Sequence, residues 1–203
     1  MLLLQLPNLE YLGLLMISEL DLEGIPLTTL HAAQFSGLRN IREISLCGDG
    51  FKSNACHATN FFSLMNCRLF DAASNPEKLS LHMCEDIMIS PAPFVFEKVK
   101  TLSITHSQLS CIVLEHLLGC CRDPENFVYE AAKPVGPAFP DYITGLMKGL
   151  RAHRHTLRTL HIDFDASYCL TESGTSLIMH LPSLEDFVAL QHLHMNWGTI
   201  LHD

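Results

Sequence analysis

The chain has 203 residues, of which 48% are hydrophobic and 17% charged, so it has enough apolar material for a sizeable core and is not a disordered chain. Its 22 acidic residues outnumber its 13 basic residues, which gives a formal charge of -9. This balance argues against a nucleic-acid-binding function, because phosphate backbones are bound mainly through Lys and Arg.

The sequence predicts neither a membrane anchor nor a disulfide framework. The opening Met1–Leu4 resembles the start of a signal peptide, but it has no basic region, and Pro7 and Glu10 interrupt the apolar run. No apolar run approaches the ~20 residues needed to cross a bilayer. The eight cysteines are unevenly spaced, include no C-x-x-C pair and lie mostly in apolar stretches. We therefore expect buried free thiols, a reducing compartment (cytoplasmic or nuclear) and no membrane partner.

A leucine-rich template, L-x-x-L-x-L, recurs seven times along the chain, with other apolar residues at some of its Leu positions and proline at the first position in two matches, Pro76 and Pro124. Its central apolar positions are Leu12, Ile44, Leu79, Leu102, Phe127, Leu160 and Leu193. Alternating apolar residues are typical of a strand with one buried face. A parallel neighbour then needs a crossover of about a dozen residues, and the repeats leave room for one. The series therefore predicts seven parallel strands that are neighbours in chain order.

Several of the connections between these strands have helical spacing of their apolar residues. This spacing predicts helices over 55–73, over 110–121 with Ser110 as the N-cap, and over 140–152. A strand and its return segment cannot bury their apolar faces alone, so neighbouring repeats must stack. We predict a single α/β domain over 1–203: a leucine-rich-repeat solenoid, or horseshoe, of about seven irregular repeats. Its parallel sheet would be concave, with helices or loops on the convex side.

We expect the repeats to be irregular. The proline-containing segments 87–94 and 131–140 are predicted to be loops. The position three residues past the last apolar strand residue is normally Asn or Cys, and its side chain hydrogen-bonds the backbone of the turn. Here it is occupied by Ile17, Asp49, Cys84, Ser107, Ala132, Asp165 and Gly198. No asparagine ladder is therefore expected. Neither end shows the polar capping repeat that a solenoid needs, so we expect a chain truncated at both ends.

Four phrases resemble the repeats of filamentous-fungal F-box and leucine-rich-repeat proteins. They are Leu6-Pro-Asn-Leu9-Glu-Tyr-Leu12, Asn126-Phe-Val-Tyr129-Glu, His155-Thr-Leu157-Arg-Thr-Leu160-His-Ile162-Asp and Leu184-Glu-Asp-Phe187-Val-Ala-Leu190-Gln-His-Leu193. The resemblance implies a horseshoe fold and a role as substrate receptor in cullin–RING ubiquitin ligases. No segment resembles the F-box itself, so a ligase adaptor would bind only through an F-box that this chain lacks. The alternative is a truncated structural remnant without a partner of its own.

No residue pattern predicts an active site, a metal centre or a cofactor site. There is no G-x-S-x-G elbow, no glycine-rich phosphate loop and no H-E-x-x-H helix. The nearest approaches to a zinc pattern are Cys56-His57 and His116 with Cys120-Cys121, which we interpret as buried thiols. Asp163-Phe-Asp165 is interpreted as part of a capped turn rather than a general acid–base pair. We expect no enzyme and no cofactor.

The candidate functional site is the inner face of the predicted sheet, formed by residues that flank the core positions. These residues are Glu43, Ser45, Lys78, Ser80, His82, Thr101, Ser103, Thr105, Asn126, Val128, Glu130, Thr159, His161, Asp163, His192, His194 and Asn196. Neighbouring strands lie about 4.8 Å apart, so we expect His161 and Asp163 beside His192 and His194. This stripe is predicted to bind a protein substrate and to gain charge below about pH 6.5. The alternative is a solvated face with no partner.

Overall fold

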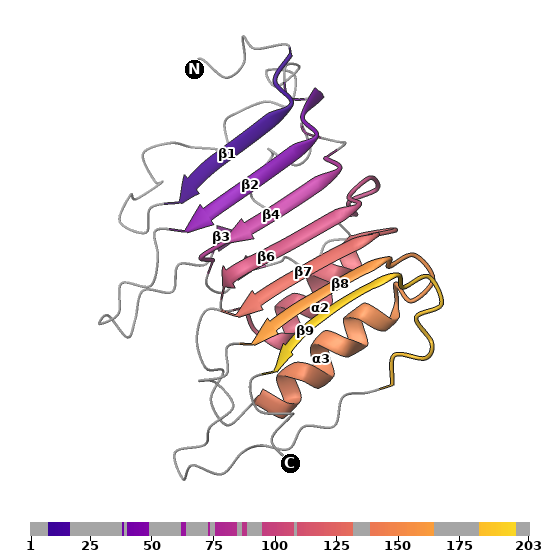
Figure 1. Ribbon diagram of the computed structural model, residues 1–203. Helices are drawn as coiled ribbons and strands as arrows, with labels where there is room; N and C mark the ends of the chain where they lie inside the picture. Colours follow the sequence, from indigo (N-terminus) through magenta and orange to yellow (C-terminus); the bar gives the residue numbers. More distant parts are fainter. Residues whose placement is uncertain are drawn as a thin grey trace, which may run out of the picture.

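A seven-stranded parallel sheet forms the body of this α/β protein (Figure 1). The computed structural model describes residues 8–16, 38, 40–48, 62–63, 73, 76–84, 87–88, 95–107, 109–131, 139–164 and 183–197. The strands of the sheet are β1 (Tyr11–Met16), β2 (Glu43–Gly48), β4 (Lys78–His82), β6 (Thr101–Ser107), β7 (Asn126–Ala131), β8 (Thr159–Phe164) and β9 (His192–Trp197). They lie side by side in this order, each parallel to the next. The predicted strand order is therefore confirmed.

The central apolar positions of the seven repeats form one row across the sheet. The row runs from Leu12 through Ile44, Leu79, Leu102, Phe127 and Leu160 to Leu193, each residue paired with the next. The members from Ile44 to Leu160 are fully buried, and burial alternates along each of these strands. A slip of one residue would turn every apolar side chain to the polar face, so the alternation fixes the register.

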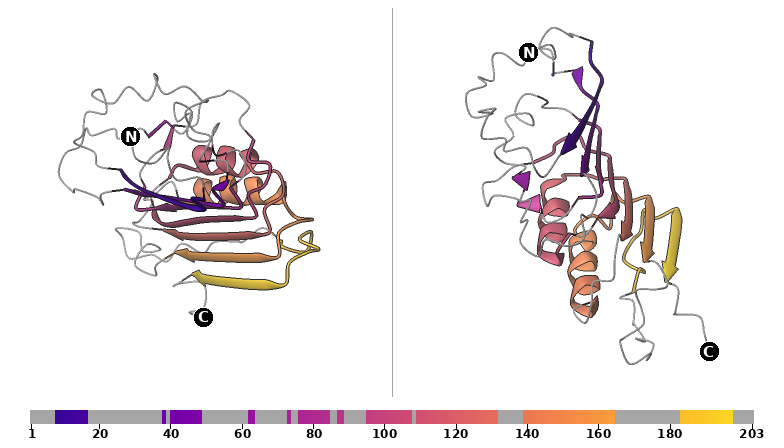
Figure 2. Two further views of the ribbon diagram at one scale, coloured as in Figure 1. Left: turned by 90° about the horizontal axis from the view of Figure 1, so that it is seen from above. Right: turned by 90° about the vertical axis from the view of Figure 1, so that its left-hand side faces the viewer.

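Two helices cover part of the apolar face of the sheet, as Figure 2 shows. They are α2 (Cys111–Cys120) and α3 (Phe139–Arg151), and both were predicted. The expected N-cap of α2 is confirmed, because the Ser110 hydroxyl accepts a hydrogen bond from the amide of Val113 at 3.4 Å. Among the described residues, no helix combines the length and the apolar character needed to span a membrane.

The two helices pack closely because α3 carries two glycines one turn apart on the side that faces α2. A methyl group on Gly145 would lie 2.8 Å from Cβ of Cys111, and one on Gly149 would lie 2.8 Å from Cδ1 of Leu118. Glycine has no Cβ, so the backbones can approach to a distance that alanine would not allow. Ile143, Leu146, Met147 and Leu150 of α3 are buried.

Matching turns end β4 and β6 and join the two strands. Met83 and His106 occupy equivalent positions and have positive φ angles of 52° and 49°. The Cys84 amide donates to the Ser107 hydroxyl at 3.0 Å, and that hydroxyl donates to the Thr105 carbonyl at 3.0 Å. At the predicted turn position, the Ser107 hydroxyl therefore bonds the backbone of both turns. The other five residues of the predicted turn position lie outside the described residues.

Two predicted connections differ from the structure where they are described. Phe62–Ser63 lies within the predicted helix 55–73 but forms strand β3, which pairs in parallel with β5 (Ile87–Met88). β5 lies within the predicted loop 87–94. The two connections satisfy part of each other's backbone hydrogen bonding, which apolar spacing within a single segment cannot reveal. The other residues of both predicted segments lie outside the described ranges.

The predicted loop 131–140 is shorter than expected at both ends. Ala131 is buried and ends β7, because it continues the alternation of that strand. Phe139 and Pro140 begin α3. Proline is compatible with the first turn of a helix, where its missing N–H would have no helical partner. The residues between these ends are not among those described.

Candidate protein-binding face

Three rows of mostly polar residues cross the sheet on the face opposite the helices, and we call this the polar face. Each row consists of residues paired across neighbouring strands. The rows contain Glu43, Lys78, Thr101, Asn126, Thr159 and His192; Ser45, Ser80, Ser103, Val128, His161 and His194; and Cys47, His82, Thr105, Glu130, Asp163 and Asn196. All the residues predicted from the sequence to form the site are therefore brought into one surface.

Exposure on the polar face depends on the position of the strand. From β2 to β8 the row residues are half-buried, because neighbouring side chains in a row cover one another. On β9, the last strand in the order, His192, His194 and Asn196 are exposed. Leu193, in the core row of that strand, is 51% exposed, whereas its partner Leu160 is fully buried. Tyr11 on β1 is also exposed, at 54%, so on this face the described residues of both edge strands are more open to solvent than the row residues between them.

The row at the amino-terminal ends of the strands, which begins at Glu43, contains two contacts between side chains of neighbouring strands. Lys78 forms an ion pair with Glu43 at 2.9 Å between neighbouring strands. The Asn126 amide donates to the Thr101 hydroxyl at 3.2 Å. Exposed ion pairs of this kind contribute little to stability, typically ~0–1 kcal/mol. The formal charges of Glu43 and Lys78 cancel, so this part of the row is neutral and offers hydrogen-bonding groups.

The two rows nearer the carboxyl ends of the strands, together with His106, contain a group of ionisable side chains that we call the histidine cluster: His82, His106, Glu130, His161 and His194. Glu130 lies between two imidazoles, with Oε1 at 4.0 Å from His161 Nε2 and Oε2 at 3.8 Å from His106 Nδ1. The rings of His161 and His194 stack with centroids 4.3 Å apart. His82 and His106 form a second ring pair at 5.3 Å.

The expected neighbours of His161 and Asp163 are correct in part. His161 pairs with His194, as predicted, and their rings are in contact. Asp163 instead pairs with Asn196, and His192 pairs with Thr159, because the register is direct rather than offset. Asp163 is half-buried on the polar face. Asp165, which was expected to share a capped turn with it, is outside the described residues.

His106 is a member of the cluster that the sequence reasoning missed. The L-x-L frame of β6 places Thr105 on the polar face and would turn the next residue to the opposite side. The register between β6 and β7 shifts between Thr105 and Ser107, and His106 has a positive φ. This bulge brings the His106 ring to Glu130 and His82. Met83, at the equivalent position after β4, also has a positive φ. Neither positive φ could be predicted from the sequence pattern.

A second missed feature lies at the amino-terminal edge of the sheet, where residues of alternating charge precede the strands. The series is Glu10, Arg42, Glu77, Lys100, Glu125 and Arg158. Consecutive members are linked by backbone hydrogen bonds, each amide donating to the carbonyl of the previous member. Glu125 forms ion pairs with Lys100 at 3.2 Å and with Arg158 at 3.7 Å. Alternating charges avoid like-charge repulsion between neighbouring strands, and aligning the repeats would have revealed them.

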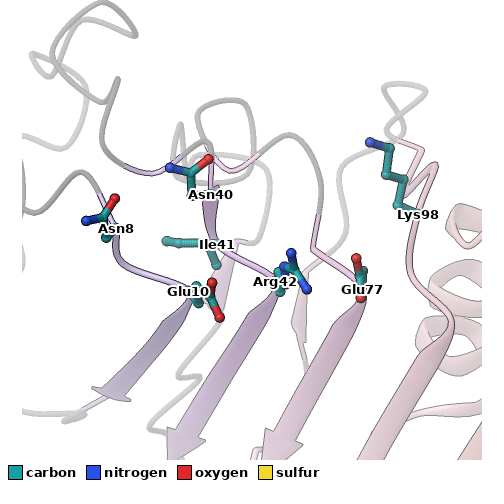
Figure 3. Close-up of a pocket in the computed structure, with 7 residues that line it drawn as sticks. All are labelled: Asn8, Glu10, Asn40, Ile41, Arg42, Glu77 and Lys98. Atoms are coloured by element: carbon teal, nitrogen blue, oxygen red, sulfur yellow. The ribbon is translucent and has the colours of Figure 1, made fainter.

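One polar pocket opens at this edge, near the start of β1, β2 and β4 (Figure 3). It has a volume of about 340 Å³ and is lined by Asn8, Glu10, Asn40, Ile41, Arg42, Glu77 and Lys98. Two carboxylates and two cationic groups line it, so their formal charges cancel. Figure 3 shows these side chains spread along the edge rather than converging on one point. The pocket therefore has no arrangement of acid, base and nucleophile suited to catalysis.

The five cysteines in the described part of the chain are free thiols, and two of them, Cys47 and Cys111, are half-buried rather than buried as expected. Cys84 and Cys121 are buried, and burial raises the pKa of these thiols to about 11 and about 12 respectively. Burial also raises the pKa of the Cys120 thiol. Thiols with raised pKa values are poor nucleophiles and poor metal ligands. No group of three potential metal ligands occurs within the described ranges, and Cys56-His57 lies outside them.

Comparison of the chain with models of protein families, with curated proteins and with solved structures found no match.

Proposed function

We propose that the protein is a non-catalytic protein-binding module of the leucine-rich-repeat solenoid type, and that its polar face binds a protein substrate. The observation that carries this proposal is the shared register of seven parallel strands, which assembles residues from distant repeats into one broad polar surface. Solenoid proteins commonly use such extended surfaces to bind partners, because each repeat adds a strip to the same face.

The chemistry of the polar face favours a protein over a nucleic acid. Lys78 is the sole Lys or Arg among the described row residues, and Glu43 already neutralises it. A phosphate backbone would find no further fixed cation there. Hydroxyl, amide, imidazole and carboxylate groups instead offer both donors and acceptors, which suits a peptide surface.

The more specific proposal is that the chain is the substrate-binding part of an F-box-type ubiquitin-ligase receptor. It is supported by the repeat phrases that resemble fungal F-box and leucine-rich-repeat proteins and by the parallel arrangement of their strands. The ligase adaptor would contact an F-box rather than the polar face. In this role the polar face selects the protein to be modified, and the chain supplies no catalytic group.

The binding proposal is tested by comparative capture from an extract of the source cells at about pH 7.5. The immobilised chain is compared with the triple variant His161→Ala, His192→Ala and His194→Ala, and with a helix-face control that carries Lys148→Ala and Arg151→Ala. We expect a protein that binds the wild type and the control but is lost from the triple variant. Its direct binding to the purified chain is then measured, with circular dichroism spectra showing that each variant is folded.

Equal capture by all three proteins would contradict a role for the polar face in binding. The ligase role has its own test, the half-life of the captured protein in cells depleted of the chain. A longer half-life and fewer ubiquitin conjugates are expected. An unchanged half-life would reject the ligase role and leave the binding role intact.

A further inference from the structure

The histidine cluster places one carboxylate, that of Glu130, between two imidazoles. Glu130 is 3.8 Å from His106 Nδ1 and 4.0 Å from His161 Nε2, beyond the length of an ordinary hydrogen bond but within the range of an ion pair. The Nε2 atom of His161 is buried and has no hydrogen-bond partner among the described residues.

The other two imidazoles of the cluster, those of His82 and His194, each lie beside another ring. His194 faces the ring of His161, and His192 and Asn196 flank it on β9. His82 Nδ1 is 2.8 Å from the Thr105 hydroxyl. Its described neighbours also include the His106 ring and Cys47, the residue paired with it on strand β2. No ion pair of His82 or His194 is present in the described part of the structure.

Charge on this part of the polar face is therefore set by protons. Asp163 pairs in register with Glu130, and together they supply two carboxylates. The cluster has four imidazoles, so the formal charge of these six side chains changes from -2 with neutral rings to +2 when all four are protonated. Histidine is the side chain that ordinarily changes charge between about pH 5 and 8. Two of the resulting cations, on His82 and His194, would be left without a counter-ion.

We propose that the histidine cluster binds an acidic segment of the protein partner, and that this binding strengthens as the pH falls below about 6.5. The inference rests on the proposed function, because it names the chemistry of the partner at the same face. Carboxylates of the partner would supply the missing counter-ions of His82 and His194. Binding to the protonated form takes up protons, so affinity must rise as the pH falls.

The test uses a fluorescent hexa-aspartate peptide with blocked ends, titrated with the full chain at about pH 7.5 and about pH 5.5, where aspartate is still ionised. Uptake of one proton allows up to about tenfold in affinity per pH unit, and we expect at least about tenfold tighter binding at the lower pH. Raising the salt concentration from about 50 mM to about 500 mM should weaken it, because the interaction is ionic.

Two variants locate the effect. His82→Gln with His194→Gln removes the uncompensated cations and should abolish the gain in affinity at low pH. His155→Gln, an exposed histidine outside the polar face, is the matched control and should retain it. Circular dichroism spectra and melting temperatures at both pH values verify that each protein is folded.

Equal affinity at the two pH values, or a pH dependence that persists in the double glutamine variant, would overturn the proposal. Tighter binding of a hexa-lysine peptide than of hexa-aspartate at the lower pH would do so as well. Capture of a cellular partner by the polar face with no pH dependence would overturn this inference while leaving the proposed function in place. If the chain showed neither pH-dependent binding of the peptide nor capture of a cellular partner, the polar face would be rejected as a binding surface.

Discussion

The Nε2 atom of His153 lies 2.9 Å from the carbonyl oxygen of Leu118, so a residue just beyond α3 completes the last turn of α2. The same carbonyl accepts a hydrogen bond from the Cys121 amide at 3.0 Å. Because a carbonyl oxygen can only accept, His153 must carry its hydrogen on Nε2. The ring is buried, and burial lowers the pKa of His153, although the Leu118 hydrogen bond and the charge of Asp123 oppose this.

His153 should make the protein less stable at mildly acidic pH. The pKa is lower in the folded state than the ordinary value of about 6.5. The unfolded chain therefore takes up the proton first, and stability is lost as the pH falls from about 6.5 through the folded-state pKa. His153→Gln retains an N–H donor for Leu118 but does not titrate. Urea unfolding from pH 7.5 to 5 should show a smaller loss of free energy for this variant, whereas the exposed His155→Gln should behave as wild type.

Gly149→Ala should destabilise the protein even though alanine favours helices. The propensity gain is about 1 kcal/mol, but the new methyl group would lie 2.8 Å from Leu118 Cδ1 and 3.2 Å from the Glu115 backbone. Overpacking of this kind costs about 1–3 kcal/mol, so we expect a net loss of up to about 2 kcal/mol. Gly119→Ala is the control, because a methyl group there meets nothing within 4 Å. Its thermal midpoint should rise or stay unchanged, and equal shifts in the two variants would contradict the close helix packing.

Leu160→Ala should cost about 2–5 kcal/mol in the free energy of unfolding, as truncation of a fully buried leucine usually does. Leu193 provides a matched control, because it pairs with Leu160 in the same row but is 51% exposed. Truncation of Leu193 removes about half as much buried area and should cost about 1 kcal/mol. Denaturant unfolding of the two variants measures the difference, and equal losses would show that the row is not buried as described.

Gly48→Ala should disrupt the end of β2. A methyl group on Gly48 would overlap the carbonyl oxygen of Met83, which belongs to the backbone of the turn after β4 and cannot rotate away. We expect a loss of about 1–3 kcal/mol, read from the melting temperature. Gly13→Ala in β1 meets the movable Tyr11 ring instead, with the nearest atom at 3.0 Å, and should be tolerated. A tolerated Gly48→Ala would argue against the close approach of Gly48, at the end of β2, to the Met83 carbonyl.

The spacing of apolar residues was enough to predict the strands, their order and the polar face. A strand with one buried face must alternate, and Ile44 and Leu79 can share a row only if the whole frame is in register. Helix α2 could also be predicted from the sequence, because the N-cap signal of Ser110 is local. These features depend on residues near one another in the chain, and the sequence by itself determines them.

Tertiary contacts decided the rest. The backbone bulge at His106 adds a fourth imidazole to the cluster around Glu130, and its positive φ follows from the joined turns of β4 and β6 rather than from its own residue type. Gly149 is unremarkable in a helical pattern until Leu118 of another helix lies against it. Such relationships join residues far apart in the chain through packing and shared hydrogen bonds, and local propensity carries no information about either.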